Sequence, residues 1–368
     1  MKVYDMDETY VLLEVEGLRV GKTFSLGGVK YYENDDAIAR IASVPMMEPE
    51  SGLDPRNDFG LPGSTMIEVG TNDHEVAIRQ AQLSLNVLRT LHYRAVQGVA
   101  YGTFGIAGYT GVGLIQYIQV RGSLVQVGIR AAGKFQGVEL SSSYIESLLS
   151  DSVFLFLDEA SLHIGEPPEA MRRALLGCRL FSLAILESNE DIATALSMSA
   201  LEAWLSPYGR SPKTLSLARH AAWFSCLRIA NDMCGRDRDA CPYLILNPDE
   251  KSNRPLLNNL IFEGSSKAGW RFLCWSAIID WYDERSTTVH GRNTGQPTGT
   301  ASEVRYWIAT QLIDPIIDWL ALHRESPIVD LQSELNNLSK PAGWEQKFDR
   351  IKKKDWQVLT PNPEGRTP

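Results

Sequence analysis

Arg285 and His290 are the residues of this chain whose types and spacing best suit acid–base chemistry on a phosphate ester. An imidazole has a reference pKa of ~6.5, so His290 can take or give a proton near neutrality. A guanidinium stays charged and grips phosphate oxygens through its planar fork. RNA cleavage needs both abilities, because a base must activate the ribose 2′-OH, an acid must protonate the leaving 5′-oxygen and a cation must stabilise the phosphorane. Since RNA supplies its own nucleophile, this chemistry requires no metal.

The spacing of the pair leaves a structural role open as well. At ~100° per residue, a five-residue step turns two side chains ~140° apart on a regular helix. Gly291 is a typical helix stop, which puts His290 in the final turn, where the helix dipole favours a charged imidazolium. The intervening residues 286–289 are weak helix formers, so the last turn is expected to be irregular. An Arg and a His at such an end can also cap carbonyls or lie in solvent.

The pair must be positioned by helices, because the second half of the chain has a helical apolar period throughout. Prolines open the first helix, and Pro207 stops the second. A polar loop is expected over 235–255, and Pro315 is expected to bend the last helix. The predicted helices cover residues 165–188, 189–207, 211–232, 265–291 and 301–325.

The first half of the chain has the sequence patterns of both helices and strands. A strand is predicted over 9–20 and another over 64–70, followed by a helix over 73–95 that Asn72 or Asp73 could cap. Two β-rich runs joined at Gly122-Ser123 predict a hairpin. The expected fold class is therefore an α+β N-terminal domain followed by an all-α bundle. The expected domains are residues 1–165, residues 166–330, and a charged, Pro-rich tail over 331–368.

Glycines are frequent between residues 101 and 113, but they lead into a predicted strand. A phosphate-binding loop would place its glycines between a strand and a helix. The chain contains neither GxGxxG nor GxxxxGK followed by Ser or Thr. The sequence therefore favours a turned or flexible loop over a nucleotide site.

The net charge of −9 is distributed unevenly along the chain. Residues 1–165 hold 12 Lys and Arg against 20 Asp and Glu, whereas residues 166–368 hold 24 against 25. A protein that coats duplex nucleic acid normally has a strong basic excess. Contact with RNA is therefore expected to be confined to a cleft or to be brief.

The cysteines and the chain ends suggest a reduced, soluble, cytoplasmic protein. The five cysteines include no CxxC pair. One histidine and three of the cysteines could be considered as zinc ligands. Their spacing matches no familiar zinc-binding pattern, so we expect neither a metal nor another cofactor. The first ten residues lack the apolar core of a signal peptide, and no apolar run is long enough to span a membrane. These candidate zinc ligands are His220, Cys226, Cys234 and Cys241.

Two segments resemble a known family. RSTTVHG, residues 285–291, resembles the R-x4–6-H signature of HEPN domains with its trailing glycine. SALEAWLSP, residues 199–207, resembles the ALE-x-L segment of the Apea-like HEPN group. The order also resembles that group: two helices ending in ALEAWL, a helical insertion, a helix ending in the motif, and a closing helix. The resemblance covers about residues 166–325.

The resemblance implies a dimeric, metal-independent endoribonuclease of the kind that serves in antiviral defence or as a toxin. By match to the motif, Arg285 and His290 carry the chemistry. Ser286 stands where many members have Asn, His or Asp, and it can hydrogen-bond but cannot titrate. Glu202 could orient Arg285 through an ion pair or form a simple structural salt bridge. Ser286 and Asn293 are further supporting candidates.

Three interpretations remain open from the sequence. The first is a HEPN ribonuclease whose RNA site is shared in a homodimer, since two-fold symmetry would supply two copies of each catalytic residue. The second is a non-catalytic HEPN module that binds a protein partner or a nucleotide. The third is a structural adaptor, whose tryptophan-rich helices are equally well explained as core. In each case the acidic N-terminal domain is expected to sense or regulate, by binding a protein or a ligand.

Overall fold

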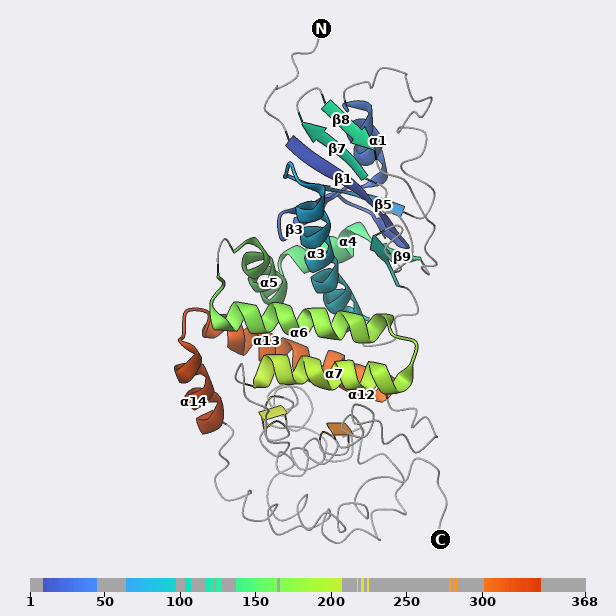
Figure 1. Cartoon of the computed structure of the whole chain (residues 1–368). Helices are drawn as coiled ribbons and strands as arrows, with labels where there is room; N and C mark the ends of the chain where they lie inside the picture. The colour runs from blue at the N-terminus through green and yellow to red at the C-terminus, as the bar shows by residue number, and fades with distance from the viewer. Residues whose placement is uncertain are drawn as a thin grey trace, which may run out of the picture. The chain divides into compact units, whose positions relative to one another are not determined.

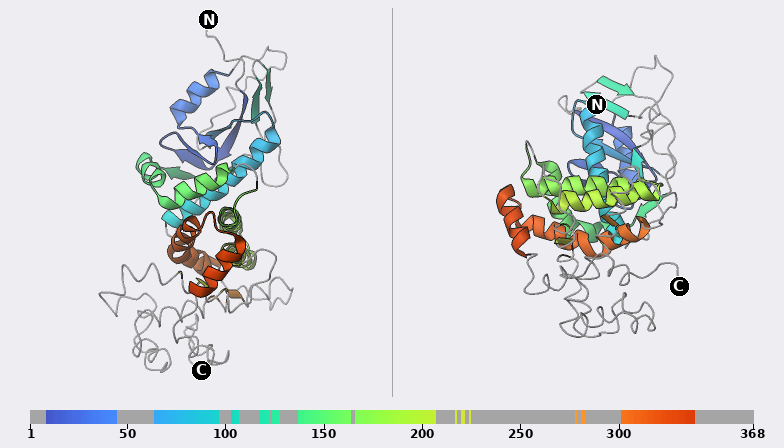
Figure 2. Two further views of the ribbon diagram at one scale, coloured as in Figure 1. Left: turned by 90° about the vertical axis from the view of Figure 1, so that its left-hand side faces the viewer. Right: turned by 60° about the horizontal axis from the view of Figure 1, so that its bottom comes forward.

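The chain divides into two compact units, Met1–Pro167 and Pro168–Pro368, which we call unit 1 and unit 2. Figures 1 and 2 show a computed structural model coloured along the chain. It describes residues 9–44, 64–96, 103–106, 117–121, 124–127, 137–163, 166–206, 217, 220, 221, 224, 278, 281, 282 and 301–338.

In the described part of unit 1, a seven-stranded sheet has the order β3-β4-β5-β1-β7-β8, with β6 also paired to β1. The β1 strand lies in the middle and pairs antiparallel with β5 and β7. A separate two-stranded parallel sheet joins β2 and β9. The strands are β1 Thr9–Glu16, β2 Leu18–Val20, β3 Phe24–Leu26, β4 Val29–Tyr31, β5 Ser64–Val69, β6 Gly105–Ile106, β7 Tyr117–Arg121, β8 Leu124–Val127 and β9 Val138–Leu140.

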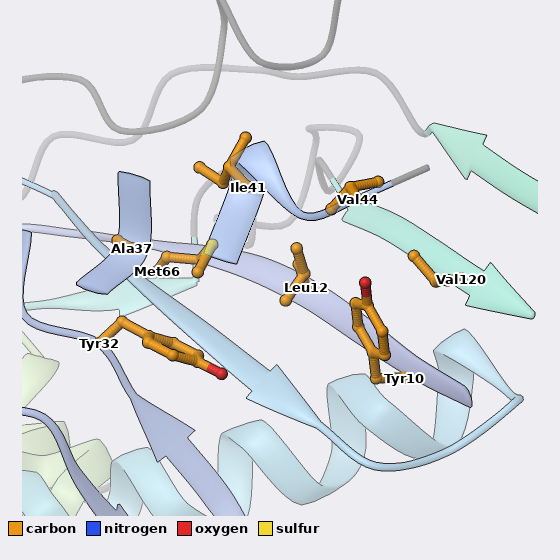
Figure 3. Close-up of a cluster of buried hydrophobic side chains, with 8 residues drawn as sticks. All are labelled: Tyr10, Leu12, Tyr32, Ala37, Ile41, Val44, Met66 and Val120. Carbon is orange, nitrogen blue, oxygen red and sulfur yellow. The ribbon is translucent and has the colours of Figure 1, made fainter. Parts of the chain in front are cut away.

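Helices cover both faces of this sheet, which explains why β1 is buried along almost its whole length. On one face, apolar residues of α1 pack on alternate residues of the central strands (Figure 3). On the other face lies the long helix α3, and α5 packs against α3. The helices of unit 1 are α1 Asn34–Ala42, α3 His74–Ala95, α4 Ser142–Leu149 and α5 Ser152–Leu162. The cluster in Figure 3 comprises Tyr10, Leu12, Tyr32, Ala37, Ile41, Val44, Met66 and Val120.

The turn between β3 and β4 is held by both α3 and α5. Gly27 and Gly28 have φ of +60° and +74°, as a two-residue hairpin turn of type I′ requires. The amide of Gly27 donates to Oδ1 of Asp158 in α5 over 2.7 Å, and Nε2 of Gln80 in α3 donates to the Gly27 carbonyl over 3.0 Å. A Cβ at Gly27 would lie 2.7 Å from Cβ of Ser161, so glycine is also required by this close approach.

The end of α3 carries a half-buried imidazole. His92 packs edge-on against the ring of Tyr144 in α4, with their centroids 6.1 Å apart. Its Nδ1 is buried and has no hydrogen-bond partner in the described part of the chain. Burial disfavours the charged form, so the pKa of His92 lies below its ordinary value of 6.5. The folded unit therefore holds His92 neutral.

Unit 1 is expected to lose stability as the pH falls below 6.5, the ordinary pKa of histidine. The unfolded chain keeps that ordinary pKa, so below it the unfolded state binds more protons than the folded state. The contribution is complete above pH 6.5 and declines as the pH falls towards the lower pKa of folded His92. Urea unfolding followed by far-ultraviolet circular dichroism at about pH 7.5 and about pH 5.5 measures this loss.

His92→Gln should show a smaller loss between the two pH values, because glutamine does not titrate. His163→Gln, at an exposed residue just beyond α5, should keep the loss of the wild-type protein. Equal losses in all three proteins would contradict the role assigned to His92.

The described residues of unit 2 are helical, with α6 and α7 packed side by side (Figure 1). Trp204 of α7 is fully buried, and its Nε1 donates to the carbonyl of Ala174 in α6 over 3.3 Å. The ring lies where a side chain at Gly177 would be, since a Cβ there would be 2.0 Å from Nε1 of Trp204. The helices are α6 Glu169–Leu186, α7 Glu190–Leu205, α12 Ala301–Trp307, α13 Ile313–Leu322 and α14 Ile328–Leu338.

The helix predicted over 301–325 is present but contains a π-helical turn, η2, over Ile308–Leu312. The amide of Ile313 bonds to the carbonyl of Ile308, five residues earlier. Pro315, the third residue of α13, has no amide hydrogen and so cannot donate the hydrogen bond of a regular α-helix. The helix α14 covers Ile328–Leu338, residues that the sequence analysis divided between the helical domain and the tail.

Candidate functional site

Four of the five candidate site residues lie outside the described part of the chain: Arg285, Ser286, His290 and Asn293. Their mutual geometry therefore stays a prediction from the sequence. The residues just before them are described, because Ile278, Trp281 and Tyr282 are helical. The helix predicted to lead into the motif is thus present one turn before Arg285.

A pair of tryptophans anchors that helix in unit 2. Trp281 is only 4% exposed, and its ring meets Trp307 of α12 at a centroid distance of 5.9 Å and an interplanar angle of 72°. Such an edge-to-face contact is favourable beyond the area that it buries. Arg285 follows Trp281 by four positions in the sequence, and residues 283–285 lie outside the described part of the chain.

Glu202, the fifth candidate, lies in the last turn of α7 and is half-buried. Its carbonyl accepts a hydrogen bond from the amide of Ser206 over 2.8 Å, which closes the helix. The ALEAWL segment therefore forms the C-terminal end of α7, as its helical period and Pro207 predict. Whether the carboxylate orients Arg285 or serves a structural salt bridge stays a prediction.

A further buried helical face lies against the end of α7. Its four described residues recur at the spacing of one helix face and are at most 2% exposed: Leu217, His220, Ala221 and Phe224. Nδ1 of His220 lies 3.3 Å from the carbonyl of Leu205, and the Phe224 ring contacts Trp319 of α13. His220 thus lies in the core of unit 2. The three cysteines considered as zinc ligands with it lie outside the described residues. Across those residues, no group of three metal-binding side chains occurs.

The closing helix is tied to the turn between α6 and α7 by one arginine. Nη1 of Arg305 donates to the carbonyl of Ala184 over 3.0 Å, and Nη2 lies 3.8 Å from Oε1 of Glu190. Three helices are thereby fixed at one end of the unit. Arg305 was not predicted from the sequence, because residues 121 apart in the chain carry no local signal of their contact.

Within the described ranges, no helix is both long enough and apolar enough to cross a membrane. In comparisons with known proteins, no family model, curated protein or solved structure matches this chain.

Proposed function

We propose that the chain is a metal-independent endoribonuclease of the HEPN type, in which Arg285 and His290 act at a cleft shared by two copies. The proposal rests on the resemblance of the RSTTVHG motif, and the observation that supports it is the helical state of described residues just before the motif. It follows a helix anchored on α12 through Trp281 and Trp307. The ALEAWL segment ends α7, two helices earlier in the order that the resemblance implies.

The reaction uses the RNA as its own nucleophile. His290 takes the proton of the 2′-OH as the 2′-oxygen attacks phosphorus, and the bond from phosphorus to the 5′-oxygen breaks. The 5′-oxygen leaves with a proton, supplied by imidazolium or, in a dimer, by the second histidine. Arg285 stabilises the charge on the phosphorane through its guanidinium fork. The products are a 2′,3′-cyclic phosphate and a 5′-hydroxyl.

The purified chain is therefore expected to cleave single-stranded RNA or tRNA in the presence of EDTA. Gel analysis with end labelling checks the products, because a cyclic phosphate end resists ligation until it is opened. In cells, expression of the wild-type chain should degrade RNA and stop growth, as expected of a defence or toxin-type effector. Cleavage only after addition of a divalent metal, or ends carrying a 5′-phosphate, would contradict this mechanism.

A second candidate is a non-catalytic HEPN module that binds a protein partner or a nucleotide. Ser286 favours it, because serine after the arginine cannot titrate as the more usual Asp or His can. The acidic charge of unit 1 favours a protein partner there over nucleic acid. An intact fold with no RNA cleavage, together with saturable binding of such a partner, would support this function over the first.

A further inference from the structure

Arg173, in the second turn of α6, is a charged group almost completely removed from solvent. The residue is 1% exposed. Its Nε donates to Oε1 of Glu169 over 2.7 Å, whereas Nη1 and Nη2 are buried and have no hydrogen-bond partner among the residues that the structure describes. A buried guanidinium with two unsatisfied nitrogens is costly, and such a group in a native protein calls for an acceptor.

The local charge does not supply that acceptor. Glu169 also pairs with Arg172, whose Nε lies 2.9 Å from Oε2 of the same carboxylate. One carboxylate therefore faces two guanidinium groups, and it contacts Arg173 only on the Nε side. Burial lowers the pKa of Arg173. A guanidinium nevertheless remains protonated near neutral pH, so the positive charge persists.

The first turn of α6 adds to this positive field. Pro168 occupies the N-cap position and offers no side-chain acceptor to the amides that follow. An 18-residue helix carries a partial positive charge at this end. Because Nε of Arg173 is bonded to Glu169, the first residue of the helix, its guanidinium is held back towards this turn.

We propose that Arg173 and the first turn of α6 bind a compact oxyanion of the phosphate class. Glu169 occupies the Nε side of the guanidinium, which leaves the Nη1–Nη2 edge for two oxygens of a tetrahedral anion. Because this edge is buried, the ligand must be small enough to be enclosed. A free phosphate or the terminal phosphate of a small molecule meets that condition, whereas a continuous RNA backbone does not. The proposal does not depend on ribonuclease activity.

Thermal unfolding of the full chain with inorganic phosphate tests the site. All nine tryptophans lie in unit 2, so their fluorescence reports the unfolding of the unit that contains Arg173. Phosphate at about 20 times its dissociation constant should raise the Tm by about 5 °C relative to chloride at equal ionic strength. Arg173→Met should abolish this rise, and Arg179→Met, at an exposed arginine of the same helix, should keep it.

Glu169→Gln provides a second test if Arg173→Met fails to fold. Glutamine removes the competing negative charge, so half of the maximal rise should occur at a lower phosphate concentration than in the wild-type chain. Glycerol 3-phosphate tests a terminal phosphate, and acetate tests whether any carboxylate suffices. The proposal fails if phosphate gives the wild-type chain no rise beyond that with chloride, if acetate gives an equal rise, or if Glu169→Gln weakens the effect.

Discussion

Gly177→Ala should destabilise unit 2 by about 3 kcal/mol, although alanine is a better helix former than glycine. The gain in helix propensity is at most about 1 kcal/mol. A steric overlap opposes this gain. The added Cβ would lie 2.0 Å from Nε1 and 2.3 Å from Cδ1 of Trp204, which is too close for a small shift of the side chain to relieve. That ring is fully buried, next to Phe181, and bonded to the carbonyl of Ala174. The packing cost therefore exceeds the propensity gain.

Urea unfolding followed by tryptophan fluorescence measures this change, because every tryptophan lies in unit 2. A double-mutant cycle with Trp204→Phe isolates its cause. Phenylalanine lacks the five-membered ring that contains Nε1 and Cδ1, so Gly177→Ala should cost less in the Trp204→Phe background. Gly70→Ala serves as the control. A Cβ at Gly70 would have no heavy atom within 4 Å, and Gly70 belongs to unit 1. A stabilising effect of Gly177→Ala would show that the two helices do not pack as described.

Arg285→Ala and His290→Ala should each lower the rate of RNA cleavage by at least about 100-fold. Removing His290 removes the proton carrier, and removing Arg285 removes the charge that stabilises the phosphorane. Single-turnover cleavage of a labelled RNA in EDTA measures both losses. The tryptophan unfolding transition should be unchanged, because neither substitution alters the Trp281–Trp307 contact that anchors the preceding helix.

Arg292→Ala is the matched control, since it removes an arginine from the same segment but not from the motif. It should retain most of the activity, as should Ser286→Ala if Ser286 only supplies a hydrogen bond. Glu202→Gln separates the two roles of that carboxylate. A loss of cleavage with unchanged stability indicates orientation of Arg285, whereas a loss of stability with retained cleavage indicates a structural salt bridge. Full activity in both Arg285→Ala and His290→Ala would exclude the proposed site.

Local signals in the sequence predicted much of the fold. The helix over 73–95 is confirmed as α3, capped by Asp73, because its apolar period and its cap are encoded within a few neighbouring residues. The hairpin at Gly122-Ser123 is likewise confirmed by the pairing of β7 with β8. The Gly27-Gly28 turn carries an equally local hairpin signal that the sequence analysis overlooked. No helix was predicted over the segment that forms α5.

Contacts between distant residues could not be predicted in the same way. The fit of Trp204 over Gly177 and the bond from Arg305 to Ala184 depend on how helices pack, which no short pattern specifies. The burial of Arg173 likewise depends on tertiary packing, and no local pattern in the sequence indicates it. For the candidate site, residue types indicated a chemistry, but the meeting of Arg285, His290 and a second copy depends on tertiary and quaternary arrangement.

The bond between Gly27 and Asp158 has a consequence for the order in which unit 1 is completed during synthesis. It joins residues 131 positions apart, at nearly opposite ends of the unit. The first hairpin can form early and Gln80 of α3 can bind its tip, but the amide of Gly27 lacks its partner until the last helix of the unit leaves the ribosome. Contacts of such long range slow folding, because the chain must close a large loop before they form. The contact that completes the first hairpin can therefore form only after α5 has been synthesised.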